Sequence, residues 1–174
     1  MRNQPAPVVV RPEGPSDVEA IFEVTRAAFA SVPHADGTEP YIVDALRSAG
    51  ALTVSLVATL HSRVVGHVGF SPVAMSDGTE GWYALGPVSV LPEIQRRGVG
   101  TALIADGLDR LRALGAAGCV LVGDPAYYVR FGFANRPGLS LEDYPASVSL
   151  ALPFADLVPR GTATFHEGFR AKTP

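Results

Sequence analysis

The sequence is poor in cysteine and has no long hydrophobic run. Its single cysteine, Cys119, cannot form an internal disulfide, which is typical of a reducing compartment. No apolar run approaches the ~20 residues that a membrane-spanning helix needs. Residues 1–10 also lack the apolar centre of a secretory signal. We therefore expect a cytoplasmic protein that has no membrane partner.

Excess charge is also absent, as are several residue patterns that carry chemistry. The formal net charge is −3, and no basic block is longer than the pair Arg96–Arg97. Duplex nucleic acid requires a broad positive face, so we do not expect a nucleic-acid partner. No HxxxH, CxxC or carboxylate cluster occurs, so we expect no metal site. The GxSxG pattern of serine hydrolases is missing as well.

What is present is enough for one domain. The chain has 174 residues, of which 47% are hydrophobic, and can bury a sizeable core. Its 18 glycines and 15 prolines lie between periodic segments, where they indicate turns. No repeat or long linker divides the chain. We expect a single domain over residues 1–174, with a core over 8–135 and less diagnostic strands over 136–174.

Hydrophobic periodicity predicts an α/β class with a mixed sheet. Helical spacing begins at a capping box in which Ser16 caps the helix and Glu19 reaches back. Asp124 and Pro125 are typical of the first residues of another helix. The predicted helices cover residues 16–30, 38–48, 98–114 and a short segment from 124. The predicted strands cover 8–11, 52–60, 64–70, 82–91, 119–122, 147–152 and 162–166.

The segment from Val88 to Leu103 carries the strongest functional pattern. A β-branched strand ends at Leu91, and a loop with two glycines, Gly98 and Gly100, leads into the longest helix. The first N–H groups of a helix have no partner inside the helix, and its dipole places partial positive charge there. Glycines let a pyrophosphate approach the backbone. The pattern therefore predicts an anion site, to which nearby arginines would add charge.

Two well-known phosphate-binding loops do not fit this segment. A P-loop requires Gly-Lys-Ser/Thr, which occurs nowhere in the chain. A dinucleotide-binding fingerprint requires a third glycine where this chain has Leu103. The pattern that remains is Gln95-x-x-Gly98-x-Gly100, which follows a strand and precedes a long helix.

Three segments of the chain resemble the GNAT superfamily of acetyl-CoA-dependent N-acetyltransferases. Residues Val90–Gly100 resemble the family's acetyl-CoA motif, Asp124–Phe133 its Y-x-x-x-G-F segment, and Val64–Val68 its third-strand element. The resemblance covers roughly residues 8 to 135. It implies a mixed, mostly antiparallel sheet of six to seven strands flanked by helices, whose fourth and fifth strands part to admit acetyl-CoA. It also allows a homodimer.

The resemblance also assigns site residues. By this resemblance the strand would bind the pantetheine arm, the loop and helix start would bind the pyrophosphate, and the first of two tyrosines would form a wall. Asp124 stands where many relatives carry Asn. In this order, the implied cofactor-binding residues are Val88, Ser89 and Val90; Gln95, Arg96, Arg97, Gly98, Val99, Gly100 and Thr101; and Tyr127, with Tyr128 beside it.

The implied reaction is the direct attack of a primary amine on the thioester of acetyl-CoA in a ternary complex. Tyr128 lies where the family's general acid lies, and an unperturbed phenol, with a pKa near 10, stays protonated at neutral pH. Glu39 is our first candidate for the base, and His34 and Asp36 are alternatives. The acceptor, a small molecule or a peptide, stays open. A CoA-binding regulatory module, or an acyltransferase with another acyl-CoA or acceptor, is the alternative function.

Overall fold

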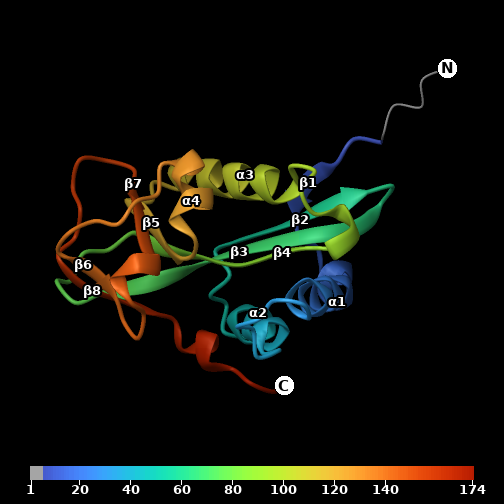
Figure 1. Ribbon diagram of the computed structural model, residues 1–174, viewed down its shortest axis with the longest axis horizontal. Coiled ribbons are helices and arrows are strands. Elements are labelled where there is room, and N and C mark those ends of the chain that lie inside the picture. Colours follow the sequence, from blue (N-terminus) through green and yellow to red (C-terminus); the bar gives the residue numbers. More distant parts are fainter. Residues whose placement is uncertain (1–5) are drawn as a thin grey trace.

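A twisted sheet forms the centre of the protein, and helices pack against both of its faces (Figure 1). The computed structural model describes residues 6–174. The first five residues, on which part of the expectation about export rests, lie outside the described residues. The strands are β1 (Val9–Pro12), β2 (Val54–Leu60), β3 (Arg63–Met75), β4 (Trp82–Val90), β5 (Gly118–Val122), β6 (Leu139–Leu141), β7 (Ser149–Pro153) and β8 (Gly161–Phe165).

The sheet is mixed and mostly antiparallel, which confirms the predicted fold class. The main order is β1-β2-β3-β4-β5-β7, and β4 and β5 are the parallel pair on this path. Strand β8 pairs with the far end of β3, and β6 pairs with β8 in parallel. The described residues therefore hold eight strands, one more than the periodicity predicted. The additional strand, β6, has three residues, which is too short for a repeating pattern.

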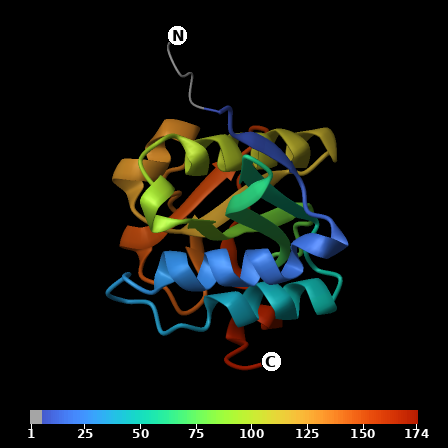
Figure 2. The ribbon, with the colours of Figure 1, turned by 90° about the vertical axis from the view of Figure 1, so that its right-hand side faces the viewer.

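Four α-helices within the described part of the chain cover the sheet. Helices α1 (Val18–Phe29) and α2 (Glu39–Ser48) lie on one face, and α3 (Val99–Ala113) and α4 (Pro125–Tyr128) lie on the other (Figures 1 and 2). No helix within residues 6–174 combines the length and the hydropathy that crossing a bilayer requires. Two layers of helix around one sheet thus enclose the core.

Helix α3 packs closely on the sheet through its apolar face, where Leu103, Ile104 and Leu111 have no exposed surface. Gly107 lies on the same face, directly over the ring of Phe70 in β3. A Cβ atom added to Gly107 would lie 2.1 Å from that ring. The absence of a side chain at residue 107 therefore sets how near α3 comes to β3.

The first helix begins differently from the prediction. A turn of 3-10 helix over Pro15–Asp17 precedes α1, and Asp17, not Glu19, accepts a hydrogen bond from the Gly14 N–H at 2.7 Å. The same carboxylate pairs with Arg11 of β1, at 2.6 and 3.0 Å. The expected role of Ser16 as cap is therefore wrong. The reason is that an arginine on the neighbouring strand holds the carboxylate at residue 17.

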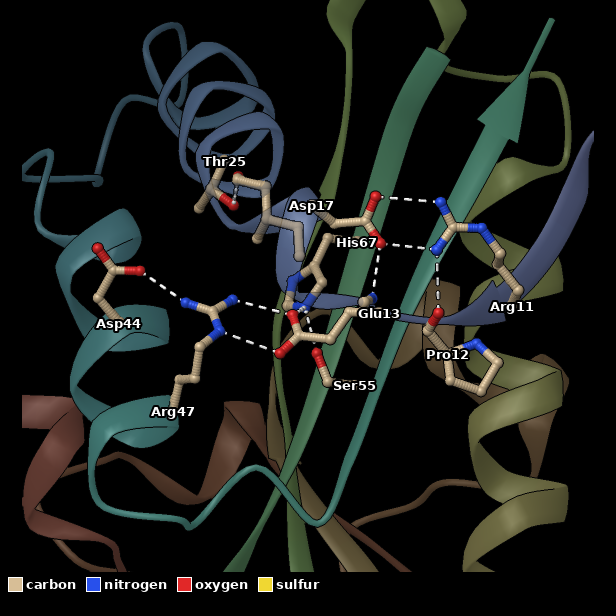
Figure 3. A network of polar contacts seen from close by, with 11 residues as sticks. Arg11, Pro12, Glu13, Asp17, Thr25, Asp44, Arg47, Ser55 and His67 are labelled. Carbon is tan, nitrogen blue, oxygen red and sulfur yellow. Dashed lines mark hydrogen bonds and ion pairs between the residues drawn. The ribbon is translucent and has the colours of Figure 1, made fainter. Parts of the chain in front are cut away.

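A polar network fastens α2 to the sheet (Figure 3). Arg47 of α2 donates to both carboxylate oxygens of Glu13, at 3.0 and 2.9 Å, and to Asp44 at 2.7 Å. The His67 ring of β3 lies beneath, with Nε2 2.8 Å from the Ser55 hydroxyl and 3.9 Å from Glu13. Burial lowers the pKa of His67 to about 4, so its ring is neutral at pH 7.

Candidate functional site

The two parallel strands part soon after they meet. Strand β4 pairs with β5 over Trp82–Ala84 only, although β4 continues to Val90. Its register with β3 shifts at a bulge that contains Gly86, whose φ of 142° favours glycine. Beyond the bulge, β4 follows β3 and leaves β5. The predicted parting of the fourth and fifth strands is confirmed.

The parting leaves backbone groups of β4 facing an open gap. The Leu91 N–H donates to the Val65 carbonyl of β3, so the backbone groups of Leu91 point toward β3. Because these directions alternate along an antiparallel strand, Ser89 also faces β3, while Val88 and Val90 face the gap. The Val90 carbonyl accepts a hydrogen bond from the Gln95 side chain at 3.0 Å. Gln95 thereby folds the loop back on the strand.

Helix α3 begins at the far end of this gap. The first hydrogen bond of the helix joins the Ala102 N–H to the Gly98 carbonyl at 3.0 Å. The N–H groups of Val99, Gly100 and Thr101 therefore have no acceptor inside the helix. Gly98 precedes the helix with a φ of 81°, a conformation that glycine adopts without strain. A helix N-terminus of this kind favours an anion.

A cavity of about 580 Å³ joins the gap, the helix N-terminus and α4. Most residues that the sequence predicted to bind a cofactor lie around it. The predicted residues that line it are Val88, Val90, Gln95, Arg96, Gly98, Val99, Gly100, Thr101, Tyr127 and Tyr128.

Three predicted site residues do not line this cavity. The Ser89 side chain is 1% exposed and stands on a residue whose backbone faces β3. Arg97 is exposed outside the lining. Glu39 begins α2, which lies on the opposite face of the sheet from α3 and α4 (Figure 1).

Two lining residues escaped the sequence analysis, namely Ile104 and Arg130. Their spacing offered a signal. Ile104 follows Gly100 by four residues and Arg130 follows Tyr127 by three, and such pairs share one face of a helical turn. A helical projection from the recognised motif residues would have found both.

Local sequence positions the two tyrosines. Asp124 caps α4 as predicted, accepting a hydrogen bond from the Ala126 N–H at 2.9 Å, and Pro125 is the first helical residue. Gly123 gives the Tyr128 ring its place, because a Cβ atom at 123 would lie 2.4 Å from that ring. The two tyrosine rings meet edge to face, with centroids 4.9 Å apart.

The environment of Tyr128 keeps its hydroxyl protonated. Burial, with a smaller contribution from the neighbouring Tyr127, raises the pKa of Tyr128 to about 12. At neutral pH this phenol can donate a proton but does not lose one spontaneously. Tyr128 is therefore suited to the role of a general acid.

The outer wall of the cavity is cationic and aromatic. The Tyr127 hydroxyl lies 3.5 Å from the Thr101 hydroxyl, so the tyrosine connects α4 to the start of α3. The Arg130 guanidinium lies 4.2 Å from the Tyr127 ring centroid. Among the described residues, no carboxylate forms an ion pair with Arg96 or Arg130. A protein of net charge −3 thus presents unpaired positive charge here.

The candidates for a general base lie near the start of α2. Glu39 is half-buried, and its Oε2 atom is buried without a hydrogen-bond partner. The Asp36 carboxylate accepts hydrogen bonds from the Thr38 hydroxyl and N–H, which lower the pKa of Asp36. His34 is exposed. Residues 6–174 contain no group of three or more His, Cys, Asp or Glu side chains placed to hold a metal ion.

The chain is also similar to known proteins in sequence. The profile of the Acetyltransferase (GNAT) family matches residues 18–133. An uncharacterized N-acetyltransferase of Escherichia coli, YhbS, is 37% identical over 127 residues, which are 72% of this chain and 73% of that protein. A second from the same organism, YjhQ, is 32% identical over 133 residues, 75% of this chain and 71% of its own.

Two solved structures share the whole fold. A GNAT family acetyltransferase from Brucella melitensis, in complex with acetyl-CoA, superposes with a TM-score of 0.84 and 45% identity, over 94% of this chain and 98% of that one. Escherichia coli YhbS, in complex with CoA, superposes with a TM-score of 0.88 and 31% identity, over 98% and 96%.

Proposed function

The chain belongs to the GNAT family of acetyltransferases, and we propose that it transfers the acetyl group of acetyl-CoA directly to a primary amine in a ternary complex. One observation carries the proposal. A single cavity joins the open edge of β4, the unpaired N–H groups of α3 and the half-buried Tyr128. These features can bind an extended amide chain, bind an anion and donate a proton.

The cavity suits acetyl-CoA because it offers a partner to each part of that molecule. Val88 and Val90 direct backbone donors and acceptors into the gap, where pantetheine amides would replace a missing strand. The N–H groups of residues 99–101 would bind the pyrophosphate, and Arg96 would add positive charge. Two solved relatives are in complex with acetyl-CoA and with CoA, which supports acetyl-CoA as the ligand of this cavity.

Two groups of β4 and α4 would act on the reacting carbonyl and sulfur. An N–H of Val88 or Val90 would stabilise the oxyanion that forms when the amine attacks. Tyr128 would protonate the sulfur as the thiolate leaves, because its raised pKa keeps the phenol protonated until that step. Acetyl-CoA supplies the activated acyl group, and these residues lower the barrier to its transfer.

Glu39 remains our candidate for the base that receives the proton of the amine. Its buried oxygen has no hydrogen-bond partner, and it begins α2, the helix that lies on the face of the sheet opposite α4. An acceptor arriving from that face would meet Glu39, while the cofactor occupies the other face. Asp36 is less suited, since its hydrogen bonds to Thr38 favour the charged, weakly basic carboxylate.

A thiol-release assay tests the proposal. The purified protein is mixed with acetyl-CoA and a panel of amines that includes peptides, lysine, polyamines and aminoglycosides. We expect free CoA to appear well above the hydrolysis background with at least one amine. Acetyl-CoA that binds in calorimetry but is never consumed would mean a regulatory module. Faster turnover with propionyl-CoA or succinyl-CoA than with acetyl-CoA would show that the enzyme prefers a different acyl donor.

Gly100→Val is the matched variant for the binding part of the proposal. A Cβ atom at residue 100 would meet Tyr127 and Val90 at 3.6 and 3.7 Å, so the fold accepts it. A larger branched side chain would occupy the anion site. We expect acetyl-CoA to bind at least tenfold more weakly, about 1.4 kcal/mol. Unchanged affinity in this variant would exclude the loop as the cofactor site.

A further inference from the structure

Contacts with Tyr127 hold the Arg130 side chain in a fixed position, but the terminal nitrogens of its guanidinium have no partner among the described residues. Its guanidinium lies over the Tyr127 ring, and its Nε donates to the Tyr127 carbonyl at 2.8 Å. The terminal nitrogens form no hydrogen bond or ion pair with another described residue. A guanidinium fixed in this way retains two outward donors, the arrangement that binds a phosphate bidentately.

The position of Arg130 separates it from the anion site at α3. The Tyr127 hydroxyl reaches Thr101 in the first turn of α3. The Arg130 guanidinium, which stacks on the Tyr127 ring, therefore lies near this turn but on the cavity wall that faces it. Arg130 is exposed and lines the cavity at this outer wall. The N–H groups of residues 99–101 already provide for one phosphate group, so Arg130 is available for another.

Another arginine of this chain shows what a purely structural stack looks like. Arg112, at the other end of α3, lies 4.6 Å from the Phe154 ring centroid, and its guanidinium also pairs with Asp109 at 3.3 Å. Arg112 does not line the cavity. Arg130 has the same kind of stack without a carboxylate partner, so its charge remains free for a ligand.

We propose that Arg130 binds the 3′-phosphate of CoA and thereby lets the enzyme distinguish CoA from 3′-dephospho-CoA. This inference rests on the proposed function. CoA carries a pyrophosphate and, on its ribose, a separate phosphomonoester with up to two negative charges. The backbone N–H groups of α3 suit the pyrophosphate, whereas a doubly charged monoester near solvent calls for a side-chain cation.

Calorimetry with two ligands tests this assignment. Acetyl-CoA and acetyl-3′-dephospho-CoA are titrated into the parent protein, Arg130→Gln and the matched control Arg112→Gln. We expect the parent to prefer acetyl-CoA by about tenfold, the gain of a charge-assisted phosphate contact. Arg130→Gln should lose most of this preference, with its affinity for the dephospho ligand unchanged. Arg112→Gln should behave as the parent.

Other results would overturn the assignment. If Arg130→Gln weakens both ligands equally, the arginine acts on the pyrophosphate or through Tyr127, and the 3′-phosphate has no part in it. A parent protein that binds both ligands alike would also exclude the proposal. If the parent binds neither ligand while remaining folded, the proposed function itself fails, and this inference fails with it.

Discussion

Tyr127 and Tyr128 are neighbours in the chain, but their hydroxyl groups belong to different surroundings. Tyr127 reaches the first turn of α3 and carries Arg130 on its ring, which makes it part of the cavity wall. Tyr128 packs against Phe133 in the space that Gly123 leaves, and burial raises its pKa to about 12. One residue along the helix therefore separates the proposed cofactor-binding surface from the proposed proton donor.

Replacing Tyr128 by Phe tests this difference. The ring and its packing are kept, so the fold and the affinity for acetyl-CoA should survive. Loss of the general acid should lower kcat by about 10²-fold, or about 2.7 kcal/mol of transition-state stabilisation. The measurement is steady-state kinetics with chemistry shown to be rate-limiting. In the matched variant Tyr127→Phe we expect kcat near that of the parent. A slow Tyr127→Phe enzyme beside a normal Tyr128→Phe enzyme would reverse the assignment.

For single residues, the sequence predicted the cofactor motif better than it predicted which residues of the motif face the cavity. Residues 95–101 were recognised because glycines at 98 and 100 let an anion approach the backbone at a helix N-terminus. Ser89 and Arg97 were included because they lie inside the same contiguous motif. A strand turns alternate residues away from a ligand, and the structure accordingly leaves Ser89 outside the cavity. Arg130 was missed because it stands at an unspecified position of the Y-x-x-x-G-F pattern, inside the recognised segment.

Among the elements, α3 depends on a close approach that helix propensity alone would not suggest. Gly107 in the middle of the helix is unfavourable by intrinsic propensity, which ranks alanine about 1 kcal/mol better. The Phe70 ring explains its presence, because it occupies the space where a Cβ atom would stand. Packing and propensity therefore favour opposite residues at this one position.

Gly107→Ala measures which effect is larger. We expect the variant to be less stable by about 2 kcal/mol, since overpacking a tight core typically costs 1–3 kcal/mol and exceeds the gain in propensity. The measurement is the free energy of unfolding in urea, without ligand. Gly100→Ala in the same helix is the control. Its Cβ atom would meet neighbours at 3.6 Å or more, so its stability should be unchanged or higher. A stabilised Gly107→Ala protein would contradict the packing argument.

Elements with many periodic residues were predicted well, and those fixed by distant partners were not. The predicted helix over 98–114 is α3 over Val99–Ala113, because a long apolar stripe defines it. Strand β6 was missed, since three residues carry no period and its partner β8 lies about twenty positions onward. The start of α1 was misplaced for the same reason. Arg11, on another element, decides which carboxylate closes the turn.

On the scale of the whole molecule, a buried histidine connects folding to pH. His67 is fully buried beneath the Glu13–Arg47 pair, and burial lowers its pKa from 6.5 to about 4. At pH values between about 4 and 6.5, His67 is protonated in the unfolded chain but neutral in the folded protein. Proton binding therefore stabilises the unfolded state as the pH falls. The free energy of unfolding accordingly increases with pH across this window.

The expected loss of stability from pH 6.5 to about pH 4 is about 3 kcal/mol for this one group. Urea unfolding at several pH values in this range measures it. His67→Gln keeps a side chain that can reach Ser55 but cannot titrate, so its stability should depend less on pH. His61→Asn is the control, because His61 is exposed in the turn between β2 and β3. Equal pH slopes in the parent and His67→Gln would show that His67 is not the cause.

The parting of β4 and β5 exposes backbone amides of a central strand to solvent. Sheets usually present unpaired backbone groups only at their outermost strands, and central strands are protected until the whole domain opens. Here Val88 and Val90 direct such groups into the gap from β4, a central strand with β5 and β7 between it and the edge. Their amide hydrogens can exchange with deuterium while every neighbouring strand stays paired. A bound pantetheine chain would close this window in the manner of an added strand, and the slowing of exchange would be confined to alternate residues.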